Sequence, residues 1–200
     1  ETYARYHGID ARANHEKVSW IDLLKQAPKA FWTVALVQFF CWFAFQYMWT
    51  YSAGAIAENV WQTTDASSSG YQAAGNWYGV LAAVQSIAAV VCSYVLAKVP
   101  NQYHKAGYFT SLALGALGFF SIFFVTDQYV LVGSYILIGI AWAGILTYPL
   151  TIVTNALSGK HMGTYLGLFN GSICIPQIIA SLLSFGLYPL LGGQPANMFL

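Results

Sequence analysis

The charged residues of this chain are spaced so that the segments between them are about as long as a bilayer is thick. No residue is charged between Lys29 and Glu58 or between Asp65 and Lys98, and the same holds for residues 106–126, 128–159 and 161–200. A transmembrane helix needs about 20 consecutive, mostly apolar residues. The spacing therefore predicts membrane spans over residues 30–55, 76–97, 106–125, 129–156 and 163–191.

The sign of the charge alternates from one boundary between spans to the next. Basic and acidic boundaries follow one another as Lys29, then Glu58 and Asp65, then Lys98 and Lys105, then Asp127, then Lys160. Loops that carry Lys and Arg stay in the cytoplasm. We therefore expect a multi-pass protein of the plasma (inner) membrane, with residues 1–29 in the cytoplasm and the first span entering from there.

The composition excludes several other classes of protein. Hydrophobic residues make up 58% of the chain and charged residues 8%, against about 25% charged residues in soluble domains. The net charge of +1 comes from scattered residues, so no nucleic-acid partner is expected. The three cysteines are Cys41, Cys92 and Cys174. All of them fall within the spans, and their spacing is not that of metal ligands. We interpret them as small packing residues, and we expect no metal and no cofactor.

The two ends of the chain differ from its middle. Ser19 and Asp22 have the spacing of a helix capping box, and apolar residues follow at helical spacing until Pro28. This pattern predicts a short amphipathic helix on the inner membrane surface. An apolar run restarts near residue 197, where a further span is expected to begin. We interpret the sequence as a fragment of a larger membrane protein.

The spans contain no Asp, Glu, Lys, Arg or His. All four histidines fall in the segments on the inner side. Proton relays and metal sites inside a membrane need ionisable groups at depth. We therefore expect no enzyme and no catalytic residue here. The carboxylates of any ion coupling are expected outside this sequence.

Neutral polar and aromatic side chains line one face of the first span. Gln38, Trp42, Phe45 and Trp49 follow one another at steps of three or four residues, with Gln46 beside them. Such steps place side chains on one helical face. An amide offers both a donor and an acceptor, and a flat indole ring packs against the apolar face of a sugar ring. The pattern therefore favours the binding of a neutral polyol.

A second set of amides lies in the fifth span, where Asn170, Gln177 and Ser181 share a helical face. Each amide alone is equally consistent with a hydrogen bond to a neighbouring helix, whereas the two faces together favour a lined cavity. Asn76 and Trp77, at the outer end of the second span, are candidates either to close that cavity or to anchor the helix at the interface. The predicted substrate-binding set is Gln38, Trp42, Gln46, Trp49, Asn76, Trp77, Asn170 and Gln177.

Two prolines and a run of glycines mark where the helices are expected to bend or approach closely. Pro149 and Pro176 interrupt the fourth and fifth spans, and each removes a backbone hydrogen bond. Broken helices commonly flank the binding sites of transporters, although kinks also occur as plain packing features. Gly163, Gly167 and Gly171 form a double GxxxG motif, which is typical of close helix packing.

Four segments together resemble a known family of membrane proteins. They are residues 37–44 (VQFFCWFA) with Met48 and Trp49, residues 75–80 (GNWYGV), residues 162–170 (MGTYLGLFN) and residues 175–178 (IPQI). Their order and spacing resemble those of major facilitator superfamily sugar transporters. The most similar branch is the glycoside–pentoside–hexuronide:cation symporters, particularly those of the sucrose- and maltose-type that use protons. The resemblance covers most of residues 19–200.

The resemblance implies an all-α, polytopic bundle that forms the C-terminal half of such a carrier, from helix seven to helix eleven and the start of helix twelve. It implies a missing N-terminal six-helix half as partner, and secondary active transport of a sugar, a disaccharide or related glycoside, by alternating access. The proton is the expected coupling cation. A carrier of another neutral solute such as a nucleoside, and a non-transporting sensor or scaffold of the same fold, stay open.

Overall fold

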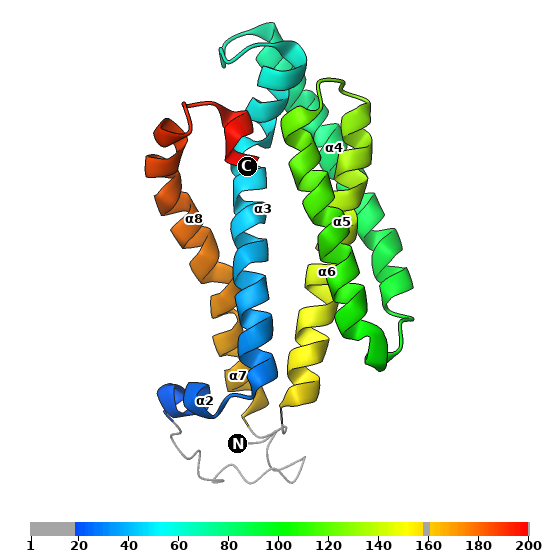
Figure 1. Ribbon diagram of the computed structural model, residues 1–200, viewed down its shortest axis with the longest axis vertical. Helices are drawn as coiled ribbons and strands as arrows, with labels where there is room; N and C mark the ends of the chain where they lie inside the picture. The colour runs from blue at the N-terminus through cyan, green and yellow to red at the C-terminus, as the bar shows by residue number, and fades with distance from the viewer. Residues whose placement is uncertain (1–18, 158–160, 200) are drawn as a thin grey trace, which may run out of the picture.

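The structure, a computed structural model, describes residues 19–157 and 161–199, and every regular element in these residues is a helix (Figure 1). The all-α prediction is therefore confirmed for the described residues. In chain order the helices are α2 (Trp20–Gln26), α3 (Lys29–Trp61), α4 (Ser69–Leu96), the 3₁₀ helix η1 (Asn101–Tyr103), α5 (His104–Phe124), α6 (Val130–Ala156), α7 (Met162–Phe169), α8 (Gly171–Leu190) and the 3₁₀ helix η2 (Pro195–Phe199).

Five helical segments are long and apolar enough to cross a membrane. They are Lys29–Trp61, Ser69–Leu96, Asn101–Phe124, Val130–Ala156 and Met162–Leu190. The last of them consists of α7 and α8, which meet at Asn170. All five expected spans thus have a helix at their position, and the helices form the bundle predicted from the charge-free segments.

The ends of several helices differ from the expected ones. Helix α3 continues to Trp61, past the expected end at residue 55, and Gln62 then ends it in the left-handed conformation. Helix α4 begins at Ser69 rather than near residue 76, because the Ser68 hydroxyl accepts a hydrogen bond from the backbone N–H of Tyr71 and caps the helix. The side chain of Ser19, in contrast, makes no capping hydrogen bond, although α2 begins directly after it.

Helix α6 is the most enclosed of the five, because α4 and α5 both pack against it. Two glycines of α6 permit this close approach. A methyl group on Gly139 would lie 2.5 Å from the carbonyl oxygen of Gln85 in α4, and one on Gly144 would lie 2.8 Å from Cβ of Ser111 in α5. Helix α3 packs mainly against α8 and α4. Helices α3 and α6 therefore form the centre of the bundle.

The charged side chains of the bundle separate toward its two ends. Lys29 and Lys105 lie at one end, which we call the basic end, whereas Glu58 and Asp127 lie at the other, which we call the acidic end. Helix α2 lies at the basic end, beside α7 (Figure 1). The hydroxyl of Tyr165 in α7 donates a hydrogen bond to the carbonyl of Leu23 in α2 at 3.1 Å. The arrangement is the one that the alternating charges predict.

The segment after α8 folds back onto the acidic end of α3. Gly192 and Gly193 have φ of 87° and 67°, values that residues with a side chain rarely adopt, and they reverse the chain. Helix η2 then packs against α3 and α5. The carboxylate of Glu58 accepts a hydrogen bond from the backbone N–H of Ala196 at 3.2 Å. The half-buried charge of Glu58 thus has a structural partner.

Candidate functional site

Three of the predicted residues, Gln38, Trp42 and Asn170, line one cavity between α3, α6 and α7. We call it the Trp42 cavity, and its volume is ≈ 250 Å³. Its other lining residues are Ile145, Leu146, Pro149, Leu150, Leu166, Phe169 and Ile173. Pro149, which was expected to flank a binding site, also lines this cavity. All of these side chains are uncharged, so the cavity suits a neutral group.

Two more of the predicted residues, Gln46 and Gln177, line a second cavity farther along α3 toward the acidic end. We call it the Gln46 cavity; its volume is ≈ 370 Å³, and Ser181 also lines it. The amide of Gln46 donates to the Ser181 hydroxyl at 3.2 Å, whereas the amide of Gln177 donates to the carbonyl of Ile173 in its own helix at 3.0 Å. The polar faces of the first and fifth spans therefore face each other in the structure.

The indole of Trp42 has an unused hydrogen-bond donor. The residue is 8% exposed, and its Nε1 is buried without a hydrogen-bond partner among the residues that the structure describes. A buried donor that has lost water and gained nothing in return costs free energy, and a buried tryptophan normally finds a partner for this group. Because Trp42 also lines the Trp42 cavity, its indole N–H is a candidate donor to a solute oxygen.

An aromatic cluster of α3 and α6 adjoins this indole. The ring centroids of Trp42 and Trp142 are 5.5 Å apart, those of Trp49 and Trp142 are 5.7 Å apart, and those of Phe45 and Trp142 are 4.9 Å apart. The two contacts between tryptophans are edge to face, a geometry that stabilises ring pairs, and the contact of Phe45 with Trp142 is tilted. Trp49, which was predicted as a ligand, is 40% exposed and lines neither cavity.

Sequence reasoning missed Trp142, although the structure places it at the centre of the cluster. The residue lies alone in an apolar stretch of α6, with no polar neighbour that would single it out. Only the packing of α3 against α6 brings it to Trp42. A search for large aromatic residues in the middle of the spans would have found it.

The side-chain amide of Gln38 already has two partners within the protein. Its Oε1 accepts a hydrogen bond from the Tyr108 hydroxyl at 3.0 Å, and its Nε2 donates to the carbonyl of Ile145 at 3.4 Å. Gln38 is 2% exposed. Tyr108 is a second residue that sequence reasoning missed, because it lies near the start of α5, far from Gln38 in the chain.

Asn76 and Trp77 lie away from both cavities. The indole N–H of Trp77 donates to the carbonyl of Gln128 at 2.9 Å, and its ring meets that of Tyr129 edge to face at 5.7 Å. Trp77 thus ties α4 to the segment before α6 at the acidic end. Asn76 is exposed on α4. Of the two roles that were left open for Asn76 and Trp77, the contacts of Trp77 fit interfacial anchoring.

Comparison with known families identifies the chain. A family model described as Major Facilitator Superfamily matches residues 5–181. The chain belongs to the Major Facilitator Superfamily. Comparisons with curated proteins and with solved structures gave no match. The superfamily consists of membrane transport proteins, and the five membrane-length helices agree with an integral, multi-pass member of it.

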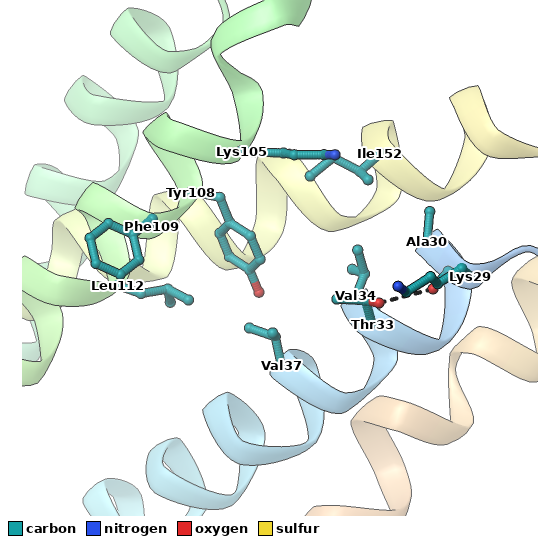
Figure 2. Close-up of a pocket in the computed structure, with 10 residues that line it drawn as sticks. All are labelled: Lys29, Ala30, Thr33, Val34, Val37, Lys105, Tyr108, Phe109, Leu112 and Ile152. Atoms are coloured by element: carbon teal, nitrogen blue, oxygen red, sulfur yellow. Dashed lines mark hydrogen bonds between the residues drawn. The ribbon is translucent and has the colours of Figure 1, made fainter.

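A further cavity of this superfamily member opens between α3, α5 and α6 at the basic end (Figure 2). Its volume is ≈ 650 Å³, and its wall is apolar except at a few positions. Lys29 and Lys105 lie at its rim, and the Thr33 hydroxyl donates to the carbonyl of Lys29 at 3.0 Å. Figure 2 shows the Tyr108 hydroxyl directed toward α3, where Gln38 lies. The cavity offers a polar solute few hydrogen-bonding groups.

The double GxxxG motif of this superfamily member faces open space in the structure. A methyl group added to Gly163 or Gly167 would have no atom within 4 Å, and one on Gly171 would meet only the Ile175 side chain of its own helix. Gly167 and Gly171 line an apolar cavity of ≈ 550 Å³ between α2, α3, α7 and α8. Among the described residues, no other helix comes within 4 Å of a methyl group at these positions, so the role of the motif in close helix packing stays a prediction.

The described residues hold no group of three or more His, Cys, Asp or Glu side chains that could bind a metal ion. The three cysteines are unpaired, and Cys41 and Cys92 are half-buried. The chemistry that the two polar cavities offer is therefore hydrogen bonding by amides, a hydroxyl and an indole, next to aromatic rings.

Proposed function

We propose that this protein carries a neutral polyol, a sugar such as a disaccharide or a related glycoside, across the membrane by alternating access. The observation that carries the proposal is the Trp42 cavity, which is lined by Trp42 and Asn170 and by no charged residue, together with the indole N–H of Trp42, which has no partner among the described residues. Sugar hydroxyls both donate and accept hydrogen bonds, so they match amides and indoles without a counter-ion. The Trp42, Trp49 and Trp142 rings supply apolar faces nearby.

The size of the Trp42 cavity supports a site that is shared with another part of the protein. At ≈ 250 Å³ it is smaller than the pockets of about 300–1,000 Å³ that hold small ligands. We infer that the N-terminal six-helix half implied by the family resemblance supplies the opposite wall. Rocking of two halves around a central site is the usual form of alternating access.

We further propose that uptake is coupled to a cation, with the proton as the expected ion. Neither polar cavity has a charged residue in its lining, and proton coupling needs an ionisable group at depth. The coupling carboxylate is therefore assigned to the other half, and no catalytic activity is expected of this one. Residues 1–29 are expected in the cytoplasm, and the plasma (inner) membrane is the proposed location.

A transport assay with the purified full-length protein in proteoliposomes tests the proposal. Labelled sucrose or maltose is supplied outside, with and without an inward proton gradient, and uptake is compared with that of empty vesicles. Saturable uptake that rises with the gradient supports a proton-coupled sugar carrier. Uptake that ignores the gradient removes the coupling, and the absence of any sugar uptake removes the function.

A carrier of another neutral solute such as a nucleoside is the second candidate, and the aromatic cluster of Trp42, Trp49 and Trp142 favours it. Indole rings stack on flat bases as well as on sugar rings. Competition of labelled sucrose with uridine and adenosine separates the two candidates. If the full-length protein binds sugar in the vesicles but does not transport it, the protein is instead a non-transporting sensor of this fold.

A further inference from the structure

Pro149 leaves one carbonyl of α6 without its helical partner. The helix continues from Val130 through Pro149 to Ala156, but proline has no backbone N–H. The carbonyl that would accept this N–H, four residues earlier, belongs to Ile145. Both Ile145 and Pro149 are buried. A buried backbone carbonyl at membrane depth needs a hydrogen-bond donor, either from the protein or from water in a cavity.

The Gln38 side chain supplies that donor from α3. Its Nε2 lies 3.4 Å from the carbonyl oxygen of Ile145, a long hydrogen bond that joins residues far apart in the chain. The Tyr108 hydroxyl donates to the amide oxygen of Gln38 at 3.0 Å, which directs the NH₂ group away from α5. Tyr108 is 6% exposed. The amide is therefore held between α5 and the interrupted turn of α6.

We propose that Gln38 is a positioning residue, which replaces the missing N–H of Pro149 and holds the break of α6 in place, rather than a ligand of the solute. Ile145 and Pro149 both line the Trp42 cavity, so the shape of this cavity depends on where α6 bends. The oxygen and the nitrogen of the Gln38 amide are both hydrogen-bonded within the protein. At the cavity wall, the side chain therefore links α3 to α5 and α6; we call this link the brace. The effect on transport rests on the proposed function, whereas the effect on folding does not.

Pro176 provides an internal comparison. It frees the carbonyl of Ser172 in the same way, but the neighbouring amide of Gln177 donates to Ile173 in its own helix. Among the hydrogen bonds of the described residues, none joins the Ser172 carbonyl to a side chain of another helix. The two prolines therefore differ: the break of α6 is braced by α3, and the break of α8 is not.

A double-mutant cycle in the full-length protein tests the brace. Gln38→Leu removes the amide, and Pro149→Ala restores the backbone N–H, so that Ile145 no longer needs Gln38. Tyr108 is kept in every variant because its hydroxyl orients the Gln38 amide, and the cost of leaving this hydroxyl unpaired in Gln38→Leu is the same with and without Pro149, so it cancels in the cycle. Unfolding is followed in detergent micelles, and Pro149→Gly serves as a second, independent restoration of the N–H.

We expect Gln38→Leu to shift the unfolding equilibrium about 10-fold toward the unfolded state in the proline background, as loss of a buried carbonyl's partner predicts. In the Pro149→Ala or Pro149→Gly background the same change should shift the equilibrium at least about 3-fold less, because Ile145 then has its helical partner and only the Tyr108 hydroxyl is left unpaired. Pro176→Ala is the matched control and should leave the cost of Gln38→Leu unchanged. An equal cost of Gln38→Leu with and without Pro149 overturns the proposal.

Transport kinetics separate positioning from direct binding. If Gln38 positions α6, the KM for sugar of the Gln38→Leu, Pro149→Ala double variant returns to that of Pro149→Ala alone. A KM that stays at least 10-fold higher in the double variant identifies Gln38 as a ligand and overturns the proposal. If the parent protein transports no sugar, the proposed function fails, and the unfolding cycle still decides the brace.

Discussion

Trp142 of α6 meets Trp42 of α3 edge to face, with ring centroids 5.5 Å apart and an interplanar angle of 73°. The contact joins the two central helices of the bundle at the level of the Trp42 cavity. Trp42 thus has its ring held by α6 while its N–H has no partner. The contact therefore fixes the orientation of a donor that no described residue uses.

Replacement of Trp142 by alanine should destabilise the protein, because the ring contacts Trp42, Phe45 and Trp49 at once. We expect a loss of about 2 kcal/mol, below the roughly 3–5 kcal/mol of a fully buried tryptophan, since Trp142 is only half-buried. Trp142→Phe should retain most of the stability. Thermal unfolding in micelles measures both, and equal stability of Trp142→Ala and the parent would contradict the role of the cluster.

Trp42→Phe removes the unpaired N–H and keeps an aromatic ring. If this N–H binds an oxygen of the solute, the KM for transport should rise about 5- to 10-fold, the value of one hydrogen bond. The stability should change by about 1 kcal/mol or less, because the loss of ring volume and the removal of an unpaired buried donor oppose each other. Trp32→Phe is the control, since Trp32 is 50% exposed and should leave the KM unchanged. An unaltered KM in Trp42→Phe would exclude this donor from the site.

Gly139→Ala should disrupt the packing of α6 on α4. The added methyl group would lie 2.5 Å from the backbone oxygen of Gln85, and backbone cannot move aside as a side chain can. We expect a loss of about 1–3 kcal/mol, as for other overpacked interiors. Gly163→Ala is the matched control; with no atom within 4 Å of the new methyl group, it should stay within about 0.5 kcal/mol of the parent. Equal effects of the two changes would contradict the packing described for α6.

The loop before α4 should respond to acid through Asp65. The side-chain hydroxyl and backbone N–H of Ser67 both donate to its carboxylate, at 2.7 Å and 2.9 Å, and they hold the pKa of Asp65 below its ordinary value of 3.8. A lowered pKa means that the charged form stabilises the loop above pH 3.8 and that this contribution is lost as the pH falls through the lower, folded value.

The protection factor of the Ser67 amide in hydrogen exchange measures this effect. The protection factor should be constant above about pH 5, and it should decrease as the pH drops below the ordinary carboxyl pKa of about 4. Asp65→Asn keeps an acceptor oxygen but cannot titrate, so its protection should not change over the same range. A parent protein whose Ser67 protection is as flat as that of Asp65→Asn would refute the assignment.

The number and order of the helices were predictable because the bilayer imposes a length on every span. The charges between Lys29 and Lys160 mark these lengths directly. The ends of the helices were harder to predict from the sequence. Helix α3, for example, continues past Glu58, where the hydropathy pattern has already changed. The cap at Ser68 could not be predicted in the same way, because Ser67 and Ser69 beside it are the same type of capping residue.

The candidate site was predictable only as helical faces. Steps of three and four residues brought Gln38, Trp42 and Gln46 to one side of α3, and the structure places that side against the other amides. The partners Tyr108, Trp142 and Ile145 were not accessible in this way. Each belongs to another helix, and no periodicity within one helix encodes which neighbour it will meet.

The hydrogen bond from Gln38 to the Ile145 carbonyl has a consequence for the evolutionary record of this protein. A proline at position 149 creates the need that the amide at position 38 meets, so a change at either position alters the selection on the other. In an alignment of relatives the two positions should therefore vary together, with amides at 38 accompanying proline at 149. Lineages that have lost the proline should be free to replace the glutamine with an apolar residue.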